Sequence, residues 1–356
     1  MFVAPRPEVA DDPLFAVRLA IMPTIGFCLG MVLQSPMAML FPIMMFSLTA
    51  GNRKAFDLKR VLGAPIAFSV MLWLMSVPVA LFNQTPLALL VIMAAVYFAG
   101  FYMIQVTGNA MGMLFIVSAA LMSVMGLGSY QAMTYLRSEM TKAALCVAIF
   151  APLLYTLLPV KTKELNVDRY VPADENGRLT RALIRAGVML VFSLYLYTIL
   201  DFGNVMLGIA GMFILVFSTQ GEIWREVGQR SFSAMLGGVL SLVVLGALTL
   251  SGHLVVLLSL TFLIVLWLAN KMMVGRLNAM VYQDAASIMI SLIGSALATS
   301  DPGFAFLQRA GLTVMGAIVA AVIVSVLDKL LVKKTSANAQ TSSHQQHTLM
   351  DAAKRQ

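Results

Sequence analysis

Charged residues are scarce in this chain of 356 residues. They make up 11% of the sequence, whereas hydrophobic residues make up 60%; soluble domains carry about 25% charged residues. The mean hydropathy is +0.88, and the apolar runs are long and continuous rather than alternating. A soluble core has no room for so much apolar surface, whereas helices in a bilayer satisfy their own backbone groups. We therefore expect an all-α, polytopic membrane protein surrounded by a lipid bilayer.

Motifs for common soluble chemistries are also missing. The nucleotide-binding pattern GxxxxGK[ST] is absent, and no Ser-His-Asp set or metal-spaced cluster of His, Cys and Glu occurs. The two cysteines, Cys28 and Cys146, lie in apolar segments and are expected to be packing residues. We therefore expect neither an enzyme nor a metal or other cofactor. The basic balance, a net charge of +8, comes from short loops between apolar runs, which argues against nucleic acid as a partner.

Twelve apolar segments predict about 12 transmembrane helices, with 36–50 and 284–300 short for a full crossing. The segments are 14–33, 36–50, 61–82, 86–106, 109–128, 140–159, 182–200, 203–219, 234–251, 254–270, 284–300 and 311–332. This pattern divides the chain into an N-terminal tail (1–13), a first six-helix unit (14–159), a linker (160–181), a second six-helix unit (182–332) and a disordered tail (333–356).

The distribution of basic residues predicts the orientation. With the N-terminus in the cytoplasm, three of the 24 Lys and Arg residues fall on the outer side (Arg137, Lys142 and Arg309) and the other 21 on the inner side. Cytoplasmic loops of membrane proteins carry this excess of positive charge. We therefore expect both termini and the linker to lie in the cytoplasm.

The two halves share landmarks at an offset of about 170 residues. LKRVLGAP around Arg60 corresponds to GQRSFSAMLGG around Arg230, and GNAMGM at Asn109 corresponds to LNAMVY at Asn278. YLRSEMTKAAL corresponds to FLQRAGLTVMGA, and Arg18 corresponds to Arg185. Four landmarks in one order predict an internal repeat. Because six spans is an even number, the two units are expected to be parallel.

Arginines followed by glycine-containing, small-residue helices recur over residues 14–332. They occur in AVRLAIMPTIGFCLGMVL, KRVLGAPIAFSVML, RALIRAGVMLVF, QRSFSAMLGGVLSLVV and QRAGLTVMGAIVAAVIV. This pattern resembles the fusaric acid resistance family, which includes aromatic acid exporters of bacterial inner membranes. Only about 20 polar residues separate the halves, so the chain resembles the compact branch without the large soluble domain. The resemblance implies efflux of small organic, often aromatic, acids, and pairing with a periplasmic HlyD-like membrane-fusion adaptor.

Polar residues inside the spans are the site candidates, because each is costly in lipid. Arg18 and Arg185 begin their units; they either bind an anionic substrate from the cytoplasm or anchor the helix at the interface. Asp284 is interpreted either as a proton-exchanging group at a cytoplasmic entrance that includes Asn278, or as a cap of the eleventh helix. Gln105 and Asn109 hold the matching place in the first half, where they bind a carboxylate or bridge helices.

Arg137 and Arg309 run against the charge rule, because they lie on the outer side. Contact with an acidic adaptor or a release path for anions would explain them. The alternative is an exposed ion pair with Glu139 or Asp301.

The sequence thus predicts an inner-membrane efflux permease for a small anionic substrate, working alone or with the adaptor. The rival hypothesis is a non-transporting scaffold for envelope or polysaccharide assembly. Whether the chain forms a homo-oligomer stays open.

Overall fold

The computed structural model describes residues 6–52, 54–109, 111–166, 172, 177–199, 214–217, 220–298 and 302–332, without the side chains of 199, 302–310, 313, 331 and 332. Within these ranges every regular element is a helix. The α-helices are α1 (Phe15–Val32), α2 (Leu40–Ala50), α3 (Leu58–Phe82), α4 (Pro86–Thr107), α5 (Met111–Gly128), α6 (Tyr130–Leu157), α7 (Arg178–Ile199), α9 (Gln220–Leu250), α10 (Leu254–Val274), α11 (Ala279–Ala298) and α12 (Pro302–Leu327). A π-helix, η1 (Asp328–Val332), continues α12.

The helices have the length and composition of membrane spans. Nine of them, within the described ranges, reach 18 residues or more with apolar windows long enough to cross a bilayer. Large apolar side chains also point outward from the bundle: Leu87 is 80% exposed and Leu250 is 89% exposed. A surface of this kind needs an apolar solvent. The chain is therefore a multi-pass helical membrane protein, as the composition predicts.

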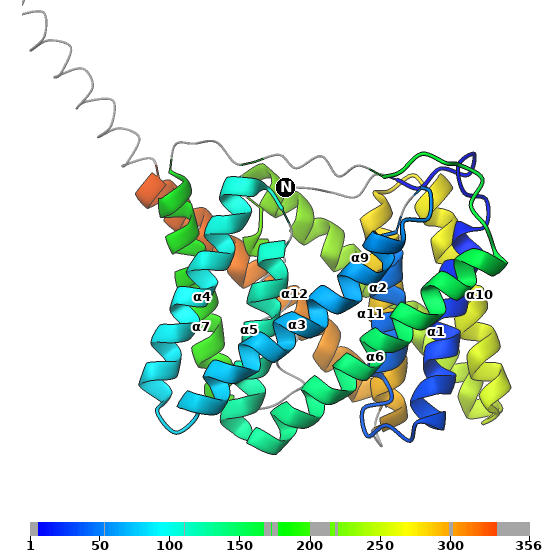
Figure 1. Cartoon of the computed structure of the whole chain (residues 1–356), viewed down its shortest axis with the longest axis horizontal. Coiled ribbons are helices and arrows are strands. Elements are labelled where there is room, and N and C mark those ends of the chain that lie inside the picture. The colour runs from blue at the N-terminus through cyan, green and yellow to red at the C-terminus, as the bar shows by residue number, and fades with distance from the viewer. Residues whose placement is uncertain are drawn as a thin grey trace, which may run out of the picture.

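From α1 to α7, and again from α9 to α12, consecutive helices run alternately between two ends of the bundle (Figure 1). The start of α1, the α2–α3 loop, the linker after α6 and the end of α12 lie at one end, and the α1–α2 and α3–α4 turns lie at the other. We call the first the basic end, because it carries the basic residues of these segments, among them Lys54, Lys59, Arg60 and Lys161. This alternation is the one that the charge pattern predicts.

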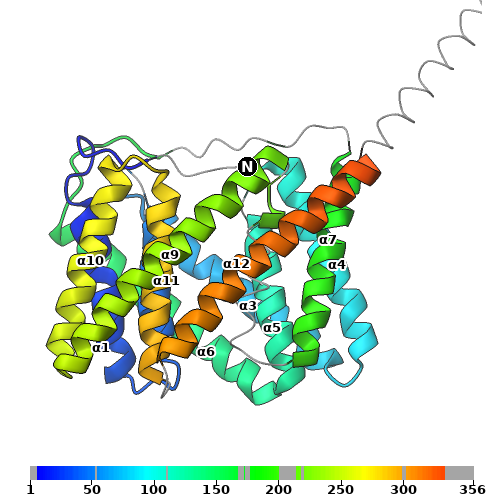
Figure 2. The same cartoon turned by 180° about the vertical axis from the view of Figure 1, so that it is seen from behind.

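Helices from the two halves of the sequence pack directly on each other. α1 lies against α10 at one side of the molecule, and α4 lies against α7 at the other. α3 and α6 cross one face obliquely, and α9 and α12 cross the opposite face (Figure 2). Small residues permit close approach: a Cβ at Gly26 of α1 would lie 2.5 Å from the Cα of Pro42, and one at Gly237 of α9 would lie 2.4 Å from the Ala285 carbonyl oxygen.

Several helices are longer than their apolar segments, or begin earlier. The prediction placed the sixth and ninth segments at 140–159 and 234–251, but α6 begins at Tyr130 and α9 at Gln220. The first turns of these two helices carry charged residues and are polar on one face only. A hydropathy pattern does not detect such turns, so it places the start of the helix too late. The second segment is short, as expected, because α2 has 11 residues. The eighth segment, 203–219, lies outside the described residues except for 214–217.

Candidate functional site at the basic end

Arg18 lies in the first turn of α1 and is almost completely buried. Its side chain is 5% exposed and pairs with Asp12, which precedes the helix. One guanidinium nitrogen, Nη1, donates to the carbonyl oxygen of Leu158 at 2.7 Å, and the guanidinium carbon lies 4.4 Å from the centre of the Tyr155 ring. Arg18 thus ties the start of α1 to the end of α6. Its charge is satisfied by a carboxylate, a carbonyl and an aromatic face.

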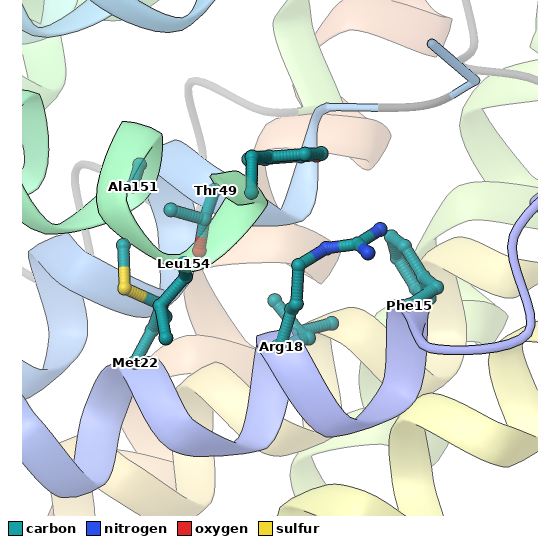
Figure 3. Close-up of a pocket in the computed structure, with 8 residues that line it drawn as sticks. Phe15, Arg18, Met22, Thr49, Ala151 and Leu154 are labelled. Carbon is teal, nitrogen blue, oxygen red and sulfur yellow. The ribbon is translucent and has the colours of Figure 1, made fainter. Parts of the chain in front are cut away.

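A small cavity adjoins Arg18 between α1, α2 and α6 (Figure 3). Its lining is apolar and aromatic apart from Arg18 and Thr49: Phe15, Arg18, Leu19, Met22, Thr49, Ala151, Leu154 and Tyr155. The Thr49 hydroxyl donates to the Met45 carbonyl oxygen at 2.6 Å, so Arg18 supplies the charge. The cavity volume is about 20 Å³, enough for one water molecule. An organic acid would need this site to widen.

Asp12 closes the Arg18 site from the side of the N-terminal segment. One carboxylate oxygen, Oδ2, pairs with Arg18, and the backbone amides of Leu14 and Phe15 also donate to this carboxylate. Burial raises the pKa of Asp12 above its usual range in spite of the neighbouring Arg18 guanidinium. The ion pair therefore recovers only part of what the burial of this carboxylate costs.

Arg185 of α7, which the sequence pattern pairs with Arg18, is fully enclosed. Its Nη2 donates to the Phe217 carbonyl oxygen at 2.8 Å and lies 3.4 Å from Oδ2 of Asp328, and its Nη1 donates to the Arg181 carbonyl oxygen. Asp328 is the first residue of η1, directly after α12. Each arginine therefore joins the first helix of its half to the end of the last one. The cavity beside Arg18 does not include Arg185 in its lining.

Asp284 lies in a second charged cluster at the basic end, between α9 and α11. Arg230 stands between two acids: its Nε lies 3.0 Å from Oε1 of Glu226, and its Nη1 lies 3.6 Å from Oδ2 of Asp284. The interpretation of Asp284 as a helix cap is wrong, because α11 begins at Ala279. With two carboxylates and one guanidinium, the cluster carries one negative charge when both acids are ionised. Uptake of a single proton would neutralise it.

Asn109 and Asn278 act as helix caps. The Oδ1 of Asn109 accepts from the Met111 amide at 2.9 Å, and the Oδ1 of Asn278 accepts from the Met280 amide at 3.3 Å. The shared Asn-Ala-Met triplet is thus explained by the starts of α5 and α11. Gln105 of α4 is buried, and its side-chain oxygen has no partner within the described chain.

Arg137 of α6 contacts α3 rather than Glu139. Its Nη1 donates to the Ser76 hydroxyl at 2.7 Å, and its guanidinium carbon lies 3.8 Å from the centre of the Trp73 ring. Glu139 instead accepts from Lys142 at 2.7 Å and from Ser35. The side chain of Arg309, and Asp301, lie outside the described residues.

No known protein family, curated protein or solved structure matches the chain. The site therefore has to be interpreted from its own geometry.

A buried hydroxyl cluster was missed by the sequence reasoning. The Tyr97 hydroxyl of α4 lies 2.8 Å from the Ser193 hydroxyl of α7, and Ser123 and Tyr197 adjoin them. Tyr97, Ser123 and Ser193 are completely buried. Serine and tyrosine are common in apolar helices, so only the packing of α4, α5 and α7 reveals the cluster. It joins the two halves through hydroxyls and carries no charge.

Proposed function

We propose that this chain is a permease of a bacterial inner membrane that exports small organic acids, aromatic ones included. The observation that carries the proposal is Arg18, a buried guanidinium beside an aromatic-lined cavity at the basic end. A guanidinium binds a carboxylate through two parallel hydrogen bonds, and aromatic side chains contact the ring of the acid. The resemblance to the fusaric acid resistance family supports the same substrate class.

The proposal places the basic end in the cytoplasm. Support comes from the positive-inside rule, since the loops and linker at this end carry most of the basic residues. Both termini then lie in the cytoplasm, and Arg18 meets the substrate before transport. An HlyD-like adaptor would contact the opposite end, where Arg137 lies.

Two parallel six-helix repeats form part of the proposal. α3 packs on α5 and α6 in the first half, and α9 packs on α11 and α12 in the second. The contact of α1 with α10 has its counterpart in the contact of α7 with α4. The contact of Arg18 with Leu158 also corresponds to the contact of Arg185 with Asp328, because Leu158 and Asp328 are 170 residues apart in the sequence. The first helix of each half thus packs against a helix of the other half. This arrangement favours a transport path between the two halves.

The cluster of Glu226, Arg230 and Asp284 is the proposed coupling site. It can hold one exchangeable proton within the membrane-spanning helices, and export of an anion against its gradient requires an energy source. Proton exchange at this cluster would supply it.

Uptake into inverted vesicles tests the function, because the cytoplasmic side then faces the medium. Respiring vesicles that contain the wild-type chain should accumulate labelled benzoate, and Arg18→Ala should reduce the initial rate about tenfold or more because the carboxylate loses its guanidinium. Arg18→Lys should keep part of the rate, since the charge remains without the two-pronged geometry.

Lys59→Ala is the matched control, because Lys59 is an exposed basic residue at the same end. It should transport as the wild type does. Equal benzoate uptake by vesicles with and without the wild-type chain would contradict export of this acid, and full activity of a well-expressed Arg18→Ala variant would remove Arg18 from the path.

A further inference from the structure

The two corresponding arginines differ in where their acid comes from. Asp328, the partner of Arg185, is built into the helical end that follows α12. Asp12, the partner of Arg18, lies on the segment before α1, six residues from Arg18. An acid within a packed helix end leaves its partner only if the bundle moves. An acid on a short preceding segment leaves by a local change.

Hydrogen bonds to both halves of the sequence hold this segment. The Asp11 carbonyl oxygen accepts from the Thr162 amide at 3.1 Å, and the Asp12 amide donates to the Glu8 carbonyl oxygen at 3.0 Å. Arg6 donates to the carbonyl oxygens of Gly275 and Leu277 in the α10–α11 loop. These bonds lie at the basic end and join the segment to both halves, whereas the carboxylate of Asp12 is directed at Arg18.

The cavity adjoins Arg18, the residue with which Asp12 pairs. Phe15, which follows the segment directly, and Arg18 both line it, as Figure 3 shows. Asp12 therefore pairs with a guanidinium that lines the cavity, and it presents the same chemical group as an organic acid.

We propose that Asp12 is a tethered carboxylate that occupies Arg18 in the absence of substrate and is displaced by the carboxylate of the transported acid. The identity of the competing acid rests on the proposed function, but the covering of Arg18 by Asp12 does not. The segment thus regulates the site: it keeps the guanidinium neutralised in the empty protein and raises the substrate concentration needed to occupy it.

The size of the effect follows from tethering. A group on a short flexible tether acts at an effective concentration in the millimolar range. Removing such a competitor should lower the benzoate concentration for half-maximal uptake about tenfold without lowering the maximal rate. A residue that only stabilises the helix start would lower the rate instead.

The decisive measurement does not require transport. Purified protein in detergent is treated with phenylglyoxal, which modifies accessible arginines, and each site is quantified by mass spectrometry. Asp12→Asn should raise the modification rate of Arg18 about tenfold, whereas Arg185 should stay unmodified in every variant as an internal control. Asp11→Asn is the matched control, because it removes the neighbouring carboxylate and keeps Asp12.

An unchanged rate at Arg18 in a monodisperse Asp12→Asn protein would overturn the proposal. If that variant does not fold, amide exchange of the wild type decides: millimolar benzoate should increase exchange at the Asp12 and Phe15 amides, and no increase would overturn it. Absent uptake together with faster modification of Arg18 would reject the transport function and keep the tethered carboxylate. Normal uptake with an unchanged modification rate of Arg18 would keep the transport function and reject the tethered carboxylate.

Discussion

Arg185→Ala should destabilise the folded protein by about 3–5 kcal/mol, the cost of leaving one member of a buried ion pair alone. Arg185 is 0% exposed, and its removal strands Asp328, whose side chain is 8% exposed. The carbonyl oxygens of Phe217 and Arg181 lose the hydrogen bonds from the guanidinium in the same step. We expect a lower midpoint of thermal unfolding in detergent, measured by fluorescence-detected gel filtration, and reduced yield from membranes.

A double substitution distinguishes this cause from a simple loss of packing. Arg185→Met together with Asp328→Leu removes both charges and keeps most of the volume, so it should recover much of the lost stability. Arg18→Ala should cost less, because Asp12 can turn toward water with its segment. A midpoint for Arg185→Ala equal to that of the wild type would show that the pair is not a structural tie.

Asp284→Asn should abolish the dependence of transport on a proton gradient. The substitution removes the Asp284 carboxylate and leaves the ion pair of Glu226 and Arg230, whose Oε1 and Nε lie 3.0 Å apart. We expect the initial rate of benzoate uptake to fall about tenfold or more in inverted vesicles with an imposed pH gradient. Downhill exchange of labelled for unlabelled benzoate should persist, because substrate binding at Arg18 is intact.

Asp284→Glu should keep part of the coupled rate, since the titratable group remains. Glu164→Gln provides the control for the loss of an acid at the basic end. Glu164 is exposed and bonded to Lys54 at 2.9 Å, which lowers the pKa of its carboxyl group; its loss should leave coupled uptake unchanged. Gradient-driven uptake by Asp284→Asn at the wild-type rate would exclude the cluster as the coupling site.

Composition and charge predict the class and the alternation of the helices because lipid imposes both. Apolar runs must become helices in a bilayer, and basic loops stay on one side. Helix boundaries are harder to predict from the sequence. α6 and α9 begin ten or more residues before their apolar segments, because their first turns contain charged residues that a hydropathy window excludes. Amphipathic helix starts of this kind are set by packing on neighbours.

The sequence singles out three of the buried charged residues at the basic end, but not their partners. Arg18, Arg185 and Asp284 stand out as costly groups in apolar segments, but their partners Asp12, Asp328 and Arg230 come from other elements or from across a helix boundary. The Asn-Ala-Met triplet occurs in both halves of the sequence, and in the structure its asparagines cap the starts of α5 and α11. Contacts between distant segments cannot be obtained from one sequence, because no local pattern encodes them.

Accessibility labelling tests the central claim most directly, namely that the basic end of a membrane-spanning bundle faces the cytoplasm. A single cysteine replaces Leu165, which is exposed in the linker at the basic end, in a chain whose Cys28 and Cys146 are changed to serine. A membrane-impermeant maleimide should label this cysteine in inverted vesicles and not in intact cells. Labelling in intact cells would place the linker outside and contradict both the orientation and the proposed direction of transport.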